Sequence, residues 1–129
     1  MQIYTSYFAQ LKKLPSNIVP VAICRFVPKW YNGAVYKKLA PLTQHLEQYK
    51  ENKDPVWFQE RYSNNVLRKL IVCNVMMDLQ HIMFAQNPNA VGVCLVCFET
   101  SDKFCHRQIV AQWLQKYGYT CTEYNFNCT

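Results

Sequence analysis

Apolar and polar residues follow one another along this chain in patterns that predict strands separated by helices. Residues 2–7 (QIYTSY) and 18–26 (IVPVAICRF) are β-branched, aromatic and apolar runs of strand length. Residues 91–98 (VGVCLVCF) form a nearly unbroken apolar run, which is typical of a strand buried on both faces of a parallel sheet. Residues 120–126 are the expected closing strand.

Between these runs, apolar residues recur at the spacing of helices. The predicted helical segments are 8–14, 38–50, 54–70 with an interruption near 63–65, 72–85 and 103–117. Strands that alternate with helices indicate an α/β fold. We therefore predict a single domain over residues 1–129: a small three-layer sandwich with a mostly parallel central sheet of the Rossmann-like or flavodoxin-like kind.

Composition indicates where in the cell this domain is found and whether its cysteines are reduced. No apolar run approaches the ~20 residues of a membrane span, and the amino terminus lacks the apolar run of a secretory signal. We therefore expect a cytoplasmic protein without a membrane partner, and the sequence leaves its oligomeric state open. Seven cysteines are an odd number, which favours reduced thiols. Cys24, Cys73 and Cys94 lie in apolar runs and are expected in the core.

Positive charge is concentrated in the first third of the chain. The net charge is +6, and residues 1–46 contain no Asp or Glu. The basic residues of this segment are Lys12, Lys13, Arg25, Lys29, Lys37 and Lys38. Such asymmetry indicates an anionic partner, either a phosphorylated small molecule or a nucleic acid. Nucleic-acid binding would require these lysines to share one face and would weaken steeply with salt.

The main candidate reactive side chains lie in residues 97–114 (CFETSDKFCHRQIVAQWL), where a predicted strand is followed by a predicted helix. Alternation along the strand places Cys97 and Glu99 together at its exit. Ser101 or Asp102 is the expected N-cap, which would put residues 105–107 in the first helical turn. Free N–H groups at such a helix start attract anions.

Cys105 is a candidate nucleophile, because a thiol in a first turn beside Lys103 and Arg107 should have a lowered pKa. Both Cys105 and His106 should lie toward the buried stripe of the helix. A turn of about 100° per residue directs His106 away from Cys105 and directs Arg107 toward the cleft mouth or solvent. His45 could act as the base only if packing brings it near. The alternative is that Cys105 and His106 have no chemical role and only pack at the buried strand–helix junction and cap the helix.

Metal binding is a second possibility for the same segment. The C-x-x-C spacing of Cys94 and Cys97 sends the two thiols to opposite faces of a strand, which removes the usual chelating pair. Cys97, Cys105 and His106 would give three zinc ligands if the loop folds back, but no fourth ligand is evident. The chain has only three glycines and no glycine-rich phosphate loop. We therefore predict no metal and no cofactor.

Several segments together resemble one protein family. These are IYTSY at 3–7, RFVPK at 25–29, KLAP at 38–41, CFE at 97–99, FCHR at 104–107 and AQWL at 111–114. They are similar to domain-of-unknown-function family 488. The resemblance implies a functional centre at Cys97, Glu99, Cys105, His106 and Arg107, joined by Tyr4, Thr5, Ser6, Arg25, Pro28 and Trp30. Phe98 stands where many relatives have tyrosine.

Our leading hypothesis is a phosphorylated, nucleotide-like ligand held at the strand end. Arg25 and Arg107 would grip phosphate, with Lys29 in the same loop as Arg25. Trp30, Tyr31 or Tyr4 would stack on a base. Glu99, Cys105 and His106 are the candidate catalytic residues for hydrolysis or transfer at a phosphoester or N-glycosidic bond. The alternative is a sequestering protein for nucleotide signals that catalyses nothing.

Overall fold

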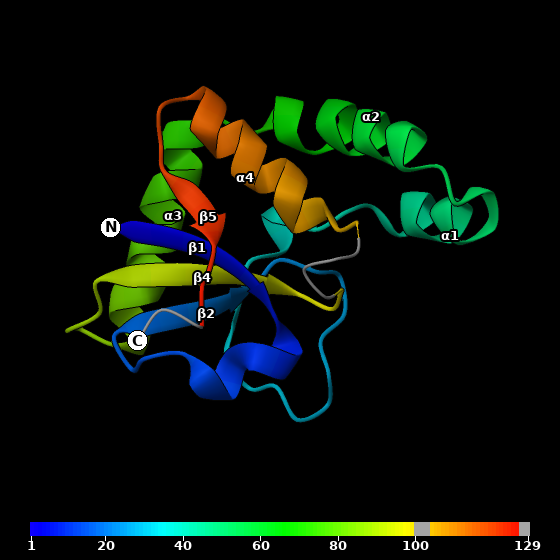
Figure 1. Ribbon diagram of the computed structural model, residues 1–129. Helices are drawn as coiled ribbons and strands as arrows, with labels where there is room; N and C mark the ends of the chain where they lie inside the picture. The colour runs from blue at the N-terminus through cyan, green and yellow to red at the C-terminus, as the bar shows by residue number, and fades with distance from the viewer. Residues whose placement is uncertain (100–103, 127–129) are drawn as a thin grey trace.

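A five-stranded parallel sheet forms the centre of the computed structural model, which describes residues 1–99 and 104–126 (Figure 1). The strand order is β3-β2-β4-β1-β5, and every neighbouring pair is parallel. The strands are β1 Gln2–Tyr7, β2 Ile18–Ala22, β3 Ala34–Val35, β4 Gly92–Cys97 and β5 Cys121–Glu123. The predicted α/β fold with a parallel sheet is thereby confirmed.

Four α-helices and three short 3₁₀ helices connect the strands within the described residues. The α-helices are α1 Thr43–Asn52, α2 Pro55–Asn65, α3 Val72–Gln86 and α4 His106–Lys116. The 3₁₀ helices are η1 Phe8–Lys13, η2 Lys37–Leu39 and η3 Leu67–Lys69. None of the helices in this part of the chain is long and apolar enough to cross a membrane.

The two faces of the sheet are covered differently. On one face, α3 and α4 pack against β4, and Val93 and Leu95 enter the larger core cluster. On the other face, Cys94 and Val96 contact a smaller cluster that contains Phe8 of η1. Figure 1 shows α3 and η1 on opposite sides of the sheet. Every residue of β4 is buried, as its apolar run predicts, because both faces are covered.

The helix predicted over 38–50 begins later, at Thr43. Ala40 is extended (φ −78°, ψ 142°) because the ring of the following proline disfavours helical backbone before it. Residues 37–39 form η2 instead.

Strand β3 was not predicted, because two residues after the Asn32-Gly33 turn give no alternation signal. Cys73, expected in the core, is exposed, whereas Cys24 and Cys94 are buried.

Candidate functional site

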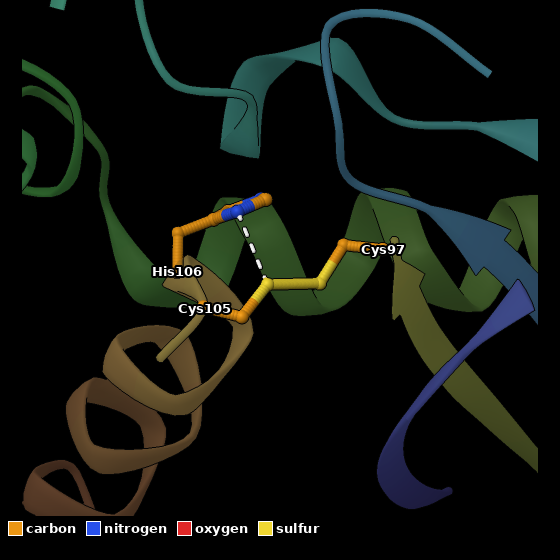
Figure 2. A group of neighbouring side chains, drawn as sticks. All are labelled: Cys97, Cys105 and His106. Atoms are coloured by element: carbon orange, nitrogen blue, oxygen red, sulfur yellow. Dashed lines mark hydrogen bonds between the residues drawn. A yellow bond between two sulfur atoms is a disulfide. The ribbon is translucent and has the colours of Figure 1, made fainter. Parts of the chain in front are cut away.

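Three side chains meet where β4 ends and α4 begins (Figure 2). The sulfur atoms of Cys97 and Cys105 are bonded as a disulfide, and the Nδ1 atom of His106 lies 3.8 Å from the Cys105 sulfur. All three residues are buried. The cluster lies at the carboxyl edge of the parallel sheet, where open α/β folds bind their ligands.

Cys105 is the N-cap of α4, so the helix starts three residues later than the sequence indicates. Its backbone is extended, with φ −151° and ψ 151°. Its sulfur accepts from the backbone N–H of Gln108, whose side-chain oxygen in turn accepts from the Cys105 N–H at 3.4 Å. Ser101 and Asp102, the predicted caps, and Lys103, the predicted neighbour of the thiol, lie outside the described residues.

His106 lies beside Cys105, and the prediction that its ring turns away was wrong. The 100° step applies between helical residues, and Cys105 is not helical. The His106 Nε2 atom is 2.6 Å from the Ile23 carbonyl oxygen, which can only accept a hydrogen bond. Nε2 therefore carries the proton, and the Nδ1 lone pair faces the sulfur. Burial lowers the pKa of His106 to about 4, against the effect of the Ile23 hydrogen bond.

Arg107 is fully buried, which corrects the prediction that it leans toward solvent. Its Nε and Nη2 atoms donate to the two carboxylate oxygens of Glu123, each at 3.1 Å. Its Nη1 donates to the Cys97 sulfur at 3.2 Å and to the Glu99 carbonyl oxygen. Burial of the guanidinium is compatible with the fold because β5 supplies this opposite charge. No local pattern links residues 107 and 123, so the sequence did not reveal Glu123.

Of the predicted β1 residues Tyr4, Thr5 and Ser6, Thr5 is hydrogen-bonded to this ion pair. The Thr5 hydroxyl donates to Glu123 Oε1 at 2.6 Å. The Ser6 hydroxyl is buried without a hydrogen-bond partner among the described residues. The Tyr4 hydroxyl donates to the Gln2 side chain at 3.0 Å. Thr5 therefore helps to hold Glu123 in place, while Tyr4 faces its own strand neighbour.

Two adjoining cavities, of about 570 and 180 Å³, open beside the cluster and share Leu46, Glu99, Cys105 and His106. Together we name them the strand-end cavity. The larger part is also lined by Tyr49, Lys50, Lys53, Phe58 and Phe104. The smaller part is also lined by Cys24, Arg25, Phe26, Pro41, Cys97 and Phe98. Three cationic side chains and one carboxylate give this cavity an excess of positive charge.

Of the remaining predicted residues, Arg25 lines the strand-end cavity, whereas Trp30 and Lys29 do not. Arg25 lines the smaller part of the cavity, and its Nε and Nη2 atoms donate to the Pro41 carbonyl oxygen at 3.2 and 3.1 Å. Trp30 is 62% exposed and packs edge-on against Phe8, and Lys29 is exposed. Neither Trp30 nor Lys29 lines the described strand-end cavity. Sequence reasoning missed Lys50 and Lys53, because no local signal relates the end of α1 to the end of β4.

A further groove, of about 520 Å³, lies between α2 and α4 and is lined by residues such as Arg68, Trp113 and Lys116. None of the candidate catalytic side chains lines it. The strand-end cavity is therefore the place where candidate reactive groups and open space coincide.

One comparison with known proteins found a family match. The family model DUF488-N3a, described as the active DUF488-N3 subclade, matches residues 9–118. The match includes Arg25, Glu99 and the whole of α4. No curated protein and no solved structure matches the chain.

Proposed function

This chain belongs to the active DUF488-N3 subclade of domain-of-unknown-function family 488, and from the lining of the strand-end cavity we propose that it binds a phosphorylated, nucleotide-like ligand there. We further propose that it hydrolyses or transfers a group at a phosphoester or N-glycosidic bond of that ligand. The observation that carries this proposal is the lining of one cavity by cations, aromatic rings and a Cys, His and Glu group.

The cations of the cavity suit phosphate. Lys50 and Lys53 line the larger part, and both side chains belong to exposed residues at the end of α1. Arg25 lines the smaller part. Ammonium and guanidinium groups are the usual partners of phosphate oxygens. We assign phosphate binding to these three residues. Arg107 instead positions Glu99 and Cys97, because its guanidinium is buried and already paired with Glu123.

The aromatic lining suits a base. The rings of Tyr49, Phe58 and Phe104 form one group, with centroids 4.9 Å apart for Tyr49 and Phe58 and 6.0 Å apart for Tyr49 and Phe104. Aromatic faces bind bases of any sequence by stacking, with about 1–3 kcal/mol per base. We expect Tyr49 and Phe104 to take the role that the sequence assigned to Trp30, because they line the cavity with the lysines.

The reactive groups would act from the floor of the cavity. Glu99 lines both parts and would serve as general acid or base. Cys105 would serve as nucleophile once its disulfide is reduced, with its proton passing to the Nδ1 atom of His106. The Ile23 carbonyl oxygen would hold the imidazole in the required tautomer.

Incubation of the reduced protein with nucleoside mono-, di- and triphosphates and with dinucleotides tests the proposal. Products would be separated by chromatography, and binding would be measured by calorimetry. Glu99→Gln should retain binding and lose about 100-fold or more in turnover, the usual contribution of a general acid or base. Glu51→Gln, in the same region of α1 as the lysines, is the matched control and should keep both. Binding without any product after long incubation would contradict the catalytic part.

A binding protein without turnover is the second candidate, and the Cys97–Cys105 disulfide favours it. A disulfide removes the thiolate that a nucleophile needs. A sequestering protein would require the cations and rings but neither Glu99 nor Cys105. Equal affinity in wild type, Glu99→Gln and Cys105→Ser, together with unchanged ligand in all three, would select this candidate.

A further inference from the structure

We infer that Cys97, Cys105 and His106, with both thiols reduced, form a site for zinc or a similar thiophilic divalent cation. The fourth coordination position of this site opens into the strand-end cavity. The inference does not rest on the proposed nucleotide-like ligand, because it concerns the floor of the cavity and not its lysines and rings.

The three donor atoms lie close enough together to share an ion once reduction breaks the Cys97–Cys105 bond and lets the two sulfur atoms move apart. The two sulfur atoms and a ring nitrogen of His106 all lie within 4.8 Å of one another. Bonds of about 2.3 Å to sulfur and about 2.0 Å to nitrogen, in a tetrahedron, place neighbouring ligand atoms about 3.5–3.8 Å apart. The Cys105 sulfur and the His106 Nδ1 are 3.8 Å apart (Figure 2).

The backbone also leaves room for an ion between the two cysteines. The Cα atoms of Cys97 and Cys105 are 7.6 Å apart. Disulfides usually join Cα atoms about 4.4–6.8 Å apart. The two residues come from separate elements, the end of β4 and the cap of α4, so the structure brings the ligands together without a C-x-x-C motif. The zinc hypothesis from the sequence required that Cys97, Cys105 and His106 come together, and in the structure they do.

Each ligand has a neighbour that orients it, as metal ligands usually do. His106 donates from Nε2 to the Ile23 carbonyl oxygen, which leaves Nδ1 as the free donor atom for a metal. Arg107 donates from Nη1 to the Cys97 sulfur at 3.2 Å. The backbone N–H of Gln108 donates to the Cys105 sulfur. Hydrogen bonds of this kind stabilise thiolates, which are the forms that bind metal.

If both thiols of the reduced centre are deprotonated, a divalent cation balances their charge. Two thiolates carry two negative charges, and a divalent cation cancels them. The positive charge of Arg107 is cancelled separately by Glu123. Because all three ligand residues and Arg107 are less than 9% exposed, two thiolates without an ion would be costly to bury. Two thiolates and an imidazole select zinc over magnesium or calcium.

Three protein ligands leave one position of the tetrahedron open, as in catalytic zinc sites. All three ligand residues line the smaller part of the strand-end cavity together with Glu99. A water molecule or a ligand oxygen would therefore complete the coordination there. With zinc bound, Cys105 is a ligand rather than a nucleophile, and the bound water takes the nucleophile's place.

Formation of the site from the oxidised protein balances as follows. A dithiol reductant passes two electrons and two protons to the Cys97–Cys105 disulfide, so that the S–S bond breaks, two thiols form and the reductant becomes a disulfide. The cation then displaces the two thiol protons and bonds to both sulfur atoms and to His106 Nδ1. Zinc binding and disulfide formation are therefore mutually exclusive states of the same pair.

The test uses the whole 129-residue chain, reduced with a water-soluble phosphine that becomes its oxide. Zinc content after dialysis is measured by mass spectrometry of the element, and cobalt is used as a spectroscopic probe. We expect about one equivalent of zinc, and a cobalt spectrum with thiolate charge transfer and tetrahedral visible bands. Cys97→Ser, Cys105→Ser and His106→Gln should each lower the cobalt affinity about tenfold or more.

Cys73→Ser is the matched control, because Cys73 is a free, exposed cysteine, and it should bind as wild type does. If a site variant fails to fold, the wild-type cobalt spectrum decides the matter, since it reports sulfur ligands and geometry directly. Reduced wild type without bound zinc or thiolate–cobalt bands would overturn the inference. Equal metal binding in wild type and the three site variants would also overturn it. Neither result would affect nucleotide binding through Lys50 and Lys53.

Discussion

Arg107 of α4 and Glu123 of β5 form a two-pronged ion pair, with Nε–Oε1 and Nη2–Oε2 distances of 3.1 Å each. The guanidinium is fully buried, while the carboxylate side chain is 34% exposed. The remaining Arg107 nitrogen bonds the Cys97 sulfur and the Glu99 backbone. One buried arginine thus connects the edge strand of the sheet to the end of β4 and so fixes the floor of the cavity.

Loss of this ion pair should destabilise the protein. In Glu123→Gln the buried guanidinium of Arg107 keeps one acceptor but loses its counter-charge. Breaking a fully buried pair costs about 3–5 kcal/mol; we expect about 2 kcal/mol here, because water reaches the carboxylate. Urea unfolding measures the change in the free energy of unfolding. Lys38→Gln removes the surface ion pair with Asp78 and should cost less than about 0.5 kcal/mol. Equal losses of unfolding free energy in Glu123→Gln and Lys38→Gln would contradict the expectation that the buried ion pair contributes more to stability than the surface pair.

Two tyrosine hydroxyls, one in the interior and one nearer the surface, offer a matched comparison. The Tyr62 hydroxyl donates to the Leu39 carbonyl oxygen in the interior, and the Tyr36 hydroxyl donates to Asp78 near the surface. Tyr62→Phe leaves a buried carbonyl without this donor and should cost about 1–2 kcal/mol. Tyr36→Phe should cost less, because water can replace the hydroxyl at Asp78. Thermal and urea unfolding of both variants measure the difference, and a larger loss for Tyr36→Phe would contradict this account.

His45 should make the folded state less stable in acid. Burial lowers its pKa below the ordinary value of 6.5, with Arg61 acting in the same direction, and its Nδ1 has no hydrogen-bond partner among the described residues. Between the folded and unfolded pKa values the unfolded chain binds more protons, so stability is complete above the unfolded pKa and falls as the pH drops below it. Urea unfolding of wild type and His45→Gln from pH 7.5 downward measures this.

The His45→Gln variant should lose less stability than wild type over the same pH interval. Carboxylates and His106 titrate in both proteins, so the difference between the two curves isolates His45. Parallel curves would show that His45 is equally protonated in the folded and unfolded chain.

The sequence predicted those features that depend on local patterns. Residues 2–7 match β1, and the apolar run at 91–98 contains the fully buried β4. Both strands were predictable because strand alternation and burial depend on residues that are adjacent in the sequence. The parallel sheet followed from the alternation of strands and helices. The sequence predicted the cluster of Cys97, Cys105 and His106 only in part. The predicted helix began at residue 103 and not at residue 106, which gave the wrong direction for the side chains of His106 and Arg107.

The features that were missed depend on contacts between distant segments. Glu123 is 16 residues beyond Arg107, and the 118 residues from Thr5 to Glu123 separate the hydroxyl from the same carboxylate. Lys50 and Lys53 reach the cavity only because α1 lies beside the start of α4, and their own segment reads as an ordinary solvated helix end. Trp30 looked like a stacking residue by type, but the fold places it against Phe8.

The central claim is that the strand-end cavity holds a phosphorylated, nucleotide-like ligand, and affinity measurements on its lysines test it most directly. Calorimetry would compare wild type with Lys50→Gln and Lys53→Asn; asparagine tolerates the left-handed backbone of residue 53, where φ is 53°. Lys69→Gln, an exposed lysine in η3, is the control. We predict that each cavity variant weakens binding of the best nucleotide about tenfold and that the control does not. Equal affinity in all four proteins would contradict the claim.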